Sequence, residues 1–428
     1  MKRVLVISYY WPPSGGSGVQ RWVKFAKYLP EEGWQVVVYT PSNPQMPALD
    51  ESLCAEVADV EVVRREIFEP YALHERLFGK SKKKAPQVNL VDAGKKSWKE
   101  RLAMWVRGNF FIPDPKCLWV GPSVRFLKKY LQEHPVDAIV STGPPHSMHL
   151  IARRLSKATG LPWVADFRDP WTRIFYFKHL SLGLCAARRH RLLEQKVLTD
   201  ATEIVAVSPR VQQEFEQMTS TPVSLITNGY DPEDFQGDVQ PDGYFNMTHT
   251  GLFARDGIPS LLWKVLAEKR RSDALFAEKF RLRLLGKTDQ EVLDEIRAAG
   301  LEDALVNLGY QDHAQAVYEQ RNATLLLLPL RKEPEYKSVL PGKLFEYLGA
   351  RRPILGVGDA DGAMADVIRE TRAGVVIDWT DQEAMAAYVD KIWQAFLQGE
   401  SPSSGDISRY SRQSTAAAMA RLLDKIQK

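Results

Sequence analysis

The stretch ATLLLLPLRKEPEYKSVLPGKLFEYLGARRPILGVG, residues 323–358, decides the fold class. It contains an apolar run at 323–330, a helical pattern that begins near Gly342, and a second apolar run at 352–358. Two nearly continuous apolar runs joined by a helix are typical of parallel strands that are covered on both faces. The stretch therefore predicts a strand–helix–strand unit of an α/β protein.

The same alternation of apolar runs and helical patterns recurs along the whole chain. A polar segment at 231–243 interrupts it once, and ESPSSGD at 400–406 precedes a final helix. We therefore predict two Rossmann-like doubly wound domains, 1–240 and 241–405, that face each other across a cleft, followed by a C-terminal helix in 406–428. The strands expected in the first domain are 3–10, 35–41, 60–66, 137–143, 162–168, 203–209 and 223–229. Those expected in the second domain are 245–251, 280–286, 305–310, 323–330, 352–358 and 373–379.

Composition sets the broad class of the protein. Of 428 residues, 44% are hydrophobic and 26% are charged, as in an ordinary globular chain. No apolar run approaches the ~18 residues that a membrane span needs. Three widely spaced cysteines without a CxxC motif predict reduced, buried thiols in the cytoplasm, with neither a disulfide nor a zinc site. The net charge of +4 is mild, and we expect no nucleic-acid partner.

Loops that follow strands are where parallel sheets bind ligands. The first is WPPSGGSGVQR, 11–21, in which Gly15 and Gly16 leave backbone amides open before a helix that can hold an anion. Its GGxG spacing, with no acidic residue after the second strand, argues against a nicotinamide dinucleotide site. A flexible turn is the alternative.

The loop STGPPHSMHL, 141–150, places His146 at a helix start. A helix N-terminus keeps an imidazole neutral, so His146 can accept a proton from a hydroxyl group. His149 is three residues further on, and we interpret it as a packed helix residue rather than a metal ligand.

The loop DFRDPW, 166–171, concentrates charge at the end of a strand. Buried charges must pair or bind a ligand, so we expect Asp166 to pair with Arg168. Asp169 lies further out and is the candidate for a contact with a substrate hydroxyl.

Two loops of the second half contain cations. Arg255 precedes a helix and can bind a phosphate, although a surface pair with Asp256 is an alternative. Lys343 lies in the first turn of a helix, where a cation is unfavourable unless an anion is close. Glu346 shares its face, and a carboxylate is the group that accepts ribose hydroxyls. An ion pair of Glu346 with Lys343 or Arg351 is the alternative.

The order and spacing of these motifs resemble the GT-B glycosyltransferases, and within them the retaining, family 4-like group that builds bacterial cell-surface polysaccharides. The resemblance covers nearly the whole chain, and its motifs are GGSGVQR, VSPRV…ITNGYDPEDF, HTG, GYQDHAQAVYEQRNATLLLLP and PGKLFEYLGARRPIL. It implies a hexosyltransferase-type enzyme with a nucleotide-sugar donor on the second domain and a saccharide or polyprenyl-linked acceptor on the first. It also implies that the final helix crosses back onto the first domain.

The resemblance implies roles for individual residues. By the family pattern, Gly15, Gly16, Arg255 and Glu346 are donor-binding positions, and from the residues themselves we add Gly251, Gly342, Lys343 and Leu344. Our catalytic candidates are Arg255, which the family pattern covers, and Lys343, His146 and Asp169, which we infer from the residues; His146 and Asp169 are expected to contact the acceptor or the sugar and not to act as nucleophiles. The family usually has a second glutamate eight positions before Glu346, where this chain has Ser338. A second cation that usually follows the Arg255 position is also missing, and Lys343 is our candidate to replace it. These departures leave the identity of the donor open.

The resemblance implies chemistry without a metal or other cofactor, because Arg255, Lys343 and helix amides can neutralise the leaving diphosphate. Two other functions remain open on the sequence. One is a nucleotide-sugar 2-epimerase of the same fold, and the other is a non-catalytic protein that binds nucleotide sugars.

A basic stretch at 80–107 contains nine Lys and Arg residues against Asp92 and Glu100. Within it, Trp98, Leu102, Trp105 and Val106 lie at helical spacing beside basic residues such as Arg101, as in amphipathic helices that bind membrane surfaces. Trp98, Arg101 and Trp105 are our candidates for the acceptor or membrane contact. We therefore expect a cytoplasmic protein whose acceptor side can lie on the inner membrane. The alternative is an ordinary packed helix with a solvated basic face.

Overall fold

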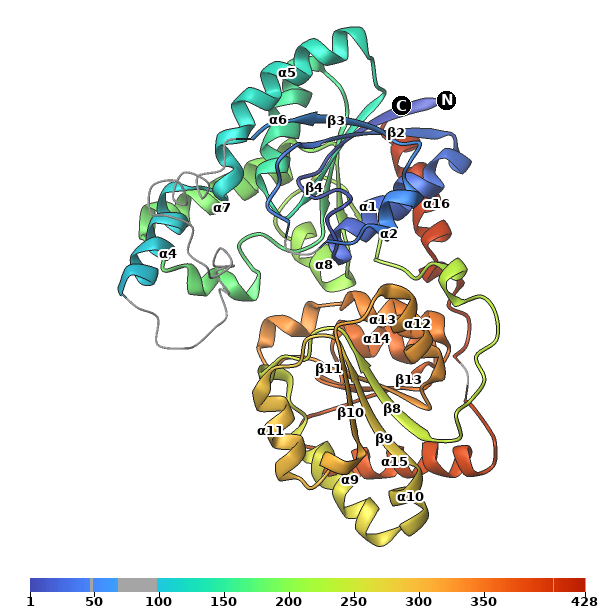
Figure 1. The fold of residues 1–428 in the computed structure, drawn as a ribbon. Helices are drawn as coiled ribbons and strands as arrows, with labels where there is room; N and C mark the ends of the chain where they lie inside the picture. The colour runs from blue at the N-terminus through green and yellow to red at the C-terminus, as the bar shows by residue number, and fades with distance from the viewer. Residues whose placement is uncertain (47–48, 68–97, 403, 428) are drawn as a thin grey trace. The chain divides into compact units, whose positions relative to one another are not determined.

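The computed structural model describes residues 1–46, 49–67, 98–402 and 404–427 (Figure 1). Contacts divide the chain into two compact units, one formed by Met1–Thr227 with Thr415–Lys428 and the other by Asn228–Ser414. Each unit contains one parallel sheet with helices on both faces. The predicted α/β class with two Rossmann-like units is confirmed. By contacts, residues 228–240 belong to the second unit, whereas the sequence analysis assigned them to the first.

The sheet of the first unit has seven strands in the order β3-β2-β1-β4-β5-β6-β7. Their bounds are β1 Lys2–Ile7, β2 Trp34–Pro41, β3 Glu61–Arg65, β4 Ala138–Gly143, β5 Trp163–Phe167, β6 Glu203–Ala206 and β7 Val223–Leu225. All seven predicted strands are present. The strand order reverses between β1 and β4, so the loops after these strands flank the switch point, where doubly wound sheets bind ligands.

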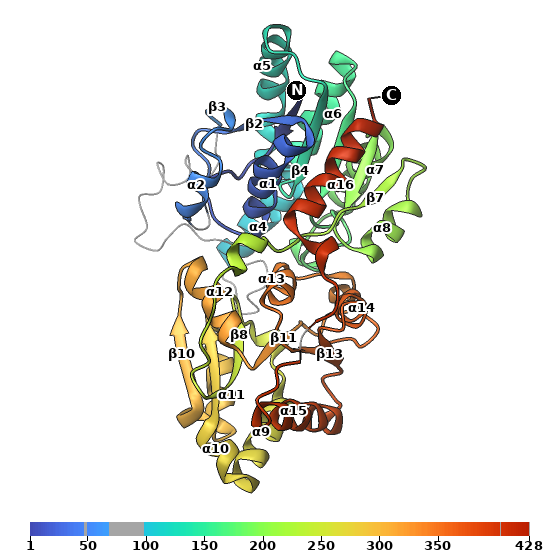
Figure 2. The same cartoon turned by 90° about the vertical axis from the view of Figure 1, so that its right-hand side faces the viewer.

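Helices cover both faces of this sheet. They are α1 Ser17–Tyr28, α2 Ser52–Glu56, α4 Trp98–Phe110, α5 Val120–Glu133, α6 Ser147–Thr159, α7 Leu184–Asp200, α8 Pro209–Glu216 and α16 Arg412–Lys425. Met419 and Leu423 of α16 share one apolar core with Val4 of β1 and Trp22 of α1. Figure 2 shows α16 on the same side of the sheet as α1. The predicted C-terminal helix therefore returns to the first unit.

The second unit also contains a parallel sheet covered by helices, with six strands in the order β10-β9-β8-β11-β12-β13. Its strands are β8 Phe245–Thr250, β9 Phe280–Leu285, β10 Leu305–Gly309, β11 Leu325–Pro329, β12 Ile354–Val357 and β13 Gly374–Ile377. Its helices are α9 Ser260–Ser272, α10 Ala274–Lys279, α11 Gln290–Ala298, α12 His313–Asn322, α13 Gly342–Ala350, α14 Ala363–Glu370 and α15 Gln382–Leu397. The stretch 323–358 forms β11, α13 and β12, with Leu326 paired to Ile354 in a parallel register.

The cysteines are free, as predicted, but they are not buried. Cys54 and Cys185 are exposed and Cys117 is partly exposed. The prediction of burial was wrong because Cys54 lies on the short helix α2 and Cys185 lies in the first turn of α7, beside the exposed Leu184. Across the described ranges, none of the helices has both the length and the apolar character needed to cross a membrane.

Candidate functional site

In the second unit, the start of α13 lies against the loop that follows β8. The Nζ atom of Lys343 donates to the carbonyl oxygen of Leu252 at 3.2 Å and lies 3.2 Å from Nε2 of His249. Gly251 has a φ of +89°, and a Cβ built there would stand 3.2 Å from the same Nζ. The fold therefore brings three predicted donor positions, Gly251, Gly342 and Lys343, to one place.

The hydrogen bonds of His249 fix its tautomer. Each ring nitrogen lies near a carbonyl oxygen, Nδ1 at 3.0 Å from Leu327 and Nε2 at 3.3 Å from Leu252. Nε2 also lies 3.2 Å from the ammonium of Lys343, which can only donate, so a neutral ring satisfies the lysine and the shorter carbonyl contact with its hydrogen on Nδ1. Nε2 then accepts from Lys343. Burial lowers the pKa of His249 well below its usual value, and the charge of Lys343 lowers it further, so the ring is neutral.

Burial also lowers the pKa of Lys343 to about 8, although the carboxylate of Glu346 opposes the shift. The amine is therefore still mostly charged at neutral pH. An ammonium group has three N–H donors, and the contacts with His249 and Leu252 use two of them. The remaining donor and the first amides of α13 suit an anion.

Glu346 lies one turn further along α13 and is held by Gln320 of α12. The Nε2 atom of Gln320 donates to Glu346 Oε2 at 2.9 Å and to Thr250 Oγ1 at 3.1 Å. Within the described part of the chain, Glu346 forms no ion pair, so the alternative in which Lys343 or Arg351 neutralises it is not what the structure shows. Its partly exposed carboxylate keeps its capacity to accept hydrogen bonds.

Two further positions from the sequence analysis are Leu344 within α13 and Ser338 shortly before it. The side chain of Leu344 is fully buried, so only its backbone amide is available to a ligand. Ser338, at the position where a second glutamate is usual, ends a short 3-10 helix, Pro334–Ser338, and is partly buried.

Arg255 follows β8 and is engaged with carboxylates in this structure. Its guanidinium lies 3.2 Å from Glu291 and 3.6 Å from Asp256. Asp256 also pairs with Arg331 at 3.2 Å. A phosphate contact by Arg255 requires it to leave these surface partners, which costs little because such pairs are weak. Sequence reasoning did not single out Arg331, although its place two residues after the end of strand β11 was a usable signal.

In the first unit, a guanidinium lies against the glycine loop after β1. A Cβ on Gly18 would stand only 1.4 Å from Nη1 of Arg168, and Gly16 has a φ of +113°. Arg168 also donates to the carbonyl oxygens of Gly143 and Pro144. The amides after Gly15 and this cation therefore lie together, an arrangement that suits an anion.

Asp166 has a different partner from the one predicted. It accepts from Arg21 at 2.9 and 3.2 Å, from Trp22 Nε1 at 2.8 Å and from Thr142 Oγ1 at 2.9 Å. Both Asp166 and Arg21 are fully buried, and these contacts lower the pKa of Asp166 although burial opposes the shift. The predicted pairing with Arg168 was wrong, because Asp166 points to the face covered by α1.

His146 lies at the N-terminus of α6, with its ring stacked on Trp171 at 4.7 Å between centroids. Burial lowers its pKa well below the usual value, with further lowering by His149, Arg168 and His190. Its buried Nδ1 has no hydrogen-bond partner among the described residues. A neutral ring with an open nitrogen is able to accept from, or donate to, a bound hydroxyl.

His149 is the packed residue that the sequence indicated. Its Nδ1 lies 2.8 Å from Ser141 Oγ, and its ring stacks on Phe167 at 4.4 Å.

The carboxylate of Asp169 receives no hydrogen bond and forms no ion pair in the described ranges. Burial raises its pKa to about 6, while the charge of Arg168 opposes the shift. A carboxylate held without a hydrogen-bond or ion-pair partner in a loop that follows a strand is a candidate for contact with a ligand. Sequence reasoning missed Glu194 of α7, which is buried and accepts from the backbone of Thr172 at 3.1 Å, so it anchors this loop.

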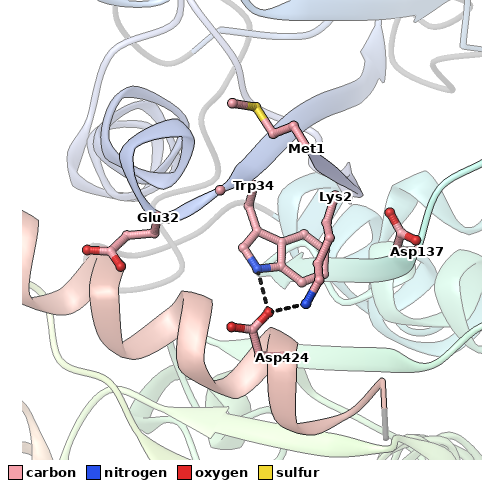
Figure 3. Close-up of a pocket in the computed structure, with 7 residues that line it drawn as sticks. Met1, Lys2, Glu32, Trp34, Asp137 and Asp424 are labelled. Atoms are coloured by element: carbon pink, nitrogen blue, oxygen red, sulfur yellow. Dashed lines mark hydrogen bonds and ion pairs between the residues drawn. The ribbon is translucent and has the colours of Figure 1, made fainter.

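A pocket of about 410 Å³ lies at the opposite edge of the first sheet (Figure 3). Asp424 of α16 accepts there from Lys2 Nζ at 2.6 Å and from Trp34 Nε1 at 3.2 Å. Lys2 and Trp34 begin their strands, so this pocket is at the amino ends, away from the edge where doubly wound sheets bind ligands. We interpret this pocket as part of the contact through which α16 packs on the sheet.

Comparison with solved structures shows the same fold over the full length. Sucrose-phosphate synthase from Thermosynechococcus elongatus superposes with a TM-score of 0.61 at 13% identity, covering 100% of this chain and 96% of that one. WaaG, a glycosyltransferase involved in lipopolysaccharide biosynthesis, gives 0.52 at 15% identity, covering 99% and 95%. A protein described as a UDP-N-acetylglucosamine 2-epimerase from Listeria monocytogenes gives 0.55 at 10% identity, covering 99% and 96%.

Sequence comparison with curated proteins finds no match. Comparison with protein families does: residues 247–395 match the family described as Glycosyl transferases group 1, and residues 16–234 match Glycosyltransferase Family 4. The second of these matches spans half of the chain. The chain belongs to glycosyltransferase family 4 and has the GT-B fold of that group.

Proposed function

We propose that this glycosyltransferase moves a hexosyl group from a nucleotide-sugar donor to a saccharide or polyprenyl-linked acceptor, with retention of anomeric configuration, in cell-surface polysaccharide biosynthesis. One observation carries the proposal. A partly buried ammonium group, that of Lys343, lies against Gly251 at the N-terminus of α13, one turn before the carboxylate of Glu346. A cation with open helix amides suits a diphosphate, and a carboxylate at this separation suits the ribose hydroxyls.

The donor is bound by the second unit in this proposal. Lys343 and the backbone amides of Gly342 and Leu344 hold the diphosphate, and Glu346 holds the ribose. Arg255 adds a second charge once it leaves Glu291, and the position of Arg331 beside Asp256 keeps further positive charge nearby. Ser338 leaves the sugar and the base unassigned, because the usual second glutamate is replaced.

The first unit supplies further groups for the diphosphate and for the reacting sugars in this proposal. The amides after Gly15 and Gly16 face the diphosphate. His146 and Asp169 contact hydroxyl groups of the sugar or the acceptor, since both are held without a described hydrogen-bond partner at the atoms concerned.

The chemistry needs no metal ion in this proposal. The bond between the anomeric carbon and the phosphate oxygen breaks, and the acceptor oxygen bonds to the face that the leaving group vacates. The acceptor proton passes to the departing diphosphate, whose charge is stabilised by Lys343, Arg255 and helix amides. Activity that is unchanged by a chelator supports this step, and activity that a chelator abolishes and Mg²⁺ restores contradicts it.

The donor site is tested by thermal shift with UDP, GDP, ADP and dTDP sugars on the wild type, on Glu346→Ala and on Glu400→Ala. Glu400 is an exposed residue of the same unit and serves as the matched control. We expect one nucleotide class to stabilise the wild type and the control, and to stabilise Glu346→Ala much less. Stabilisation that is intact in Glu346→Ala shows that the ribose is bound elsewhere.

The epimerase alternative has a specific discriminating measurement. Incubation with the stabilising nucleotide sugar alone, without acceptor, gives no epimerised sugar if the protein is a transferase. Epimerised product under these conditions identifies the isomerase. Tight donor binding without turnover or donor hydrolysis, with every acceptor tried, identifies a non-catalytic binding protein.

A polyprenyl-linked acceptor would bring the first unit to the cytoplasmic face of the inner membrane.

A further inference from the structure

Helix α4 presents a row of large apolar side chains to solvent. Trp98 is 70% exposed, Trp105 is 43% exposed and Phe110 is 69% exposed. Leu102 and Val106 are exposed between them, and the rings of Trp105 and Phe110 meet edge to face at 5.7 Å. Five such residues on one short helix form a patch, whereas single exposed apolar residues are normal on protein surfaces.

The opposite face of α4 already packs on the first unit. Met104 is buried, and a Cβ on Gly108 would stand 2.7 Å from the side chain of Leu182. The amide of Asn109 accepts from the backbone of Gly183 at 2.8 Å and donates to Ser181 at 3.3 Å. The helix is therefore fixed by one face, and the apolar row is its outward face.

The start of α7 extends the same surface. α4 and α7 lie side by side in Figure 1, and the Asn109 contacts hold Gly183 and thus Leu184 beside α4. Leu184 is 92% exposed. We call the six residues Trp98, Leu102, Trp105, Val106, Phe110 and Leu184 the α4–α7 surface.

Basic side chains accompany this surface. Exposed arginines on the two helices are Arg101, Arg188, Arg189 and Arg191. Between Leu184 and Gln195, the one acidic residue of α7 is Glu194, and it is buried. The exposed charge of this part of α7 is therefore positive.

We propose that the α4–α7 surface docks on a bilayer that contains anionic phospholipid. Tryptophan and phenylalanine side chains insert at the boundary between headgroups and acyl chains, and arginines bind the lipid phosphates. The charge argues against a second copy of this chain as the occupant, because a two-fold contact would place the same arginines against each other. The proposal does not depend on the donor site. It extends the proposed function by naming the surface through which a lipid-linked acceptor is reached.

The test is co-sedimentation of the full chain with vesicles of phosphatidylcholine alone and of phosphatidylcholine with phosphatidylglycerol. Two double variants separate the apolar contribution from the basic one. Trp98→Ala with Trp105→Ala removes apolar side chains, and Arg188→Glu with Arg191→Glu reverses the charge of two arginines. Tyr310→Ala with Leu397→Ala is the matched control, because these exposed apolar residues lie in the second unit. All altered side chains are exposed, so the melting temperature reports whether each variant is folded.

We expect the wild type and the control to bind the anionic vesicles, and each α4–α7 variant to bind about tenfold less. Binding of the tryptophan variant at the wild-type level, or equal binding of the wild type to neutral vesicles, overturns the proposal. So does self-association in sedimentation velocity that the tryptophan variant abolishes. The nucleotide-sugar thermal shift of the same variants stays at the wild-type value, which separates this proposal from a failure of the donor site.

Discussion

The ammonium nitrogen of Lys343 lies 3.2 Å from Nε2 of His249, an imidazole whose other nitrogen already donates to Leu327. Burial and the charge of Lys343 lower the pKa of His249 well below its usual value, so the imidazole stays neutral. It therefore acts as a hydrogen-bond acceptor that fixes the position of the lysine ammonium group. A cation is thereby held at the N-terminus of α13, where the helix dipole would otherwise disfavour it. This relationship makes the proposed donor site sensitive to pH in a defined range.

Binding of UDP, or of the nucleoside diphosphate that the screen selects, is expected to weaken as pH rises through about 8, the pKa of Lys343. At pH 9 about a tenth of the lysine remains charged, so the affinity falls by about tenfold relative to pH 7. Calorimetric titration at both pH values measures this. Lys343→Met is expected to bind weakly at both, and an equal pH dependence in that variant would assign the effect to another group.

Removing the acceptor at His249 is expected to disorder Lys343. His249→Phe leaves the ammonium without its Nε2 partner, and we expect the dissociation constant to rise by about tenfold or more at pH 7. His249→Gln retains an acceptor and is expected to recover part of the affinity. If the two variants bind equally, the histidine serves packing and not the position of the lysine.

Gly251→Ala is expected to lose donor affinity and stability together. The left-handed φ of +89° costs about 1–2 kcal/mol with a side chain, and the new methyl group stands 3.2 Å from Lys343 Nζ. Gly300→Ala is the control, because its φ of +77° carries the same strain with no atom within 4 Å. Equal melting temperatures with a higher dissociation constant in Gly251→Ala alone isolate the lysine contact. Equal dissociation constants would show that this contact does not matter for the donor.

Asp169→Asn is expected to raise stability while it lowers activity. Since burial raises the pKa of Asp169 to about 6, above the 3.8 of the unfolded chain, ionisation opposes folding as pH rises through this range. The variant should therefore melt higher than the wild type at pH 7.5 and equally at pH 3.5. We expect transfer to fall by about 10² or more. Asp59→Asn, at an exposed site, should change neither property, and a lower melting temperature for Asp169→Asn at pH 7.5 would indicate a structural carboxylate.

Asp166→Ala is expected to destabilise the first unit by about 3–5 kcal/mol, because it leaves Arg21 buried without its counter-charge. Glu214→Ala breaks the surface pair with Arg173 and should cost about 1 kcal/mol or less. Denaturant unfolding measures both. Since the folded pKa of Asp166 is lowered, its contribution is complete above pH 3.8 and is lost as pH falls through the folded value. Similar losses in the two variants would contradict the buried pair.

The sequence by itself determined the architecture, because strands and helices are encoded by local patterns. Each predicted strand of both sheets is present, from 3–10, which forms β1, to 373–379, which contains β13. The opening stretch 323–358 forms the predicted strand, helix and strand with the expected parallel pairing. The family followed from the order of motifs at strand ends, and that too is a local property of the chain.

Only the tertiary structure decided which side chains meet. Lys343 and His249 are 94 positions apart, and Arg21 and Asp166 are 145 apart. The nearest cation in the sequence suggested Arg168 as the partner of Asp166. Strand β5 ends at Phe167, however, and Arg168 donates to the carbonyl oxygens of Gly143 and Pro144, whereas Arg21 of α1 reaches Asp166. Local patterns fix the elements, whereas contacts across a sheet depend on strand order and on the helix that covers each face. The chemistry of this site therefore became visible only with the fold.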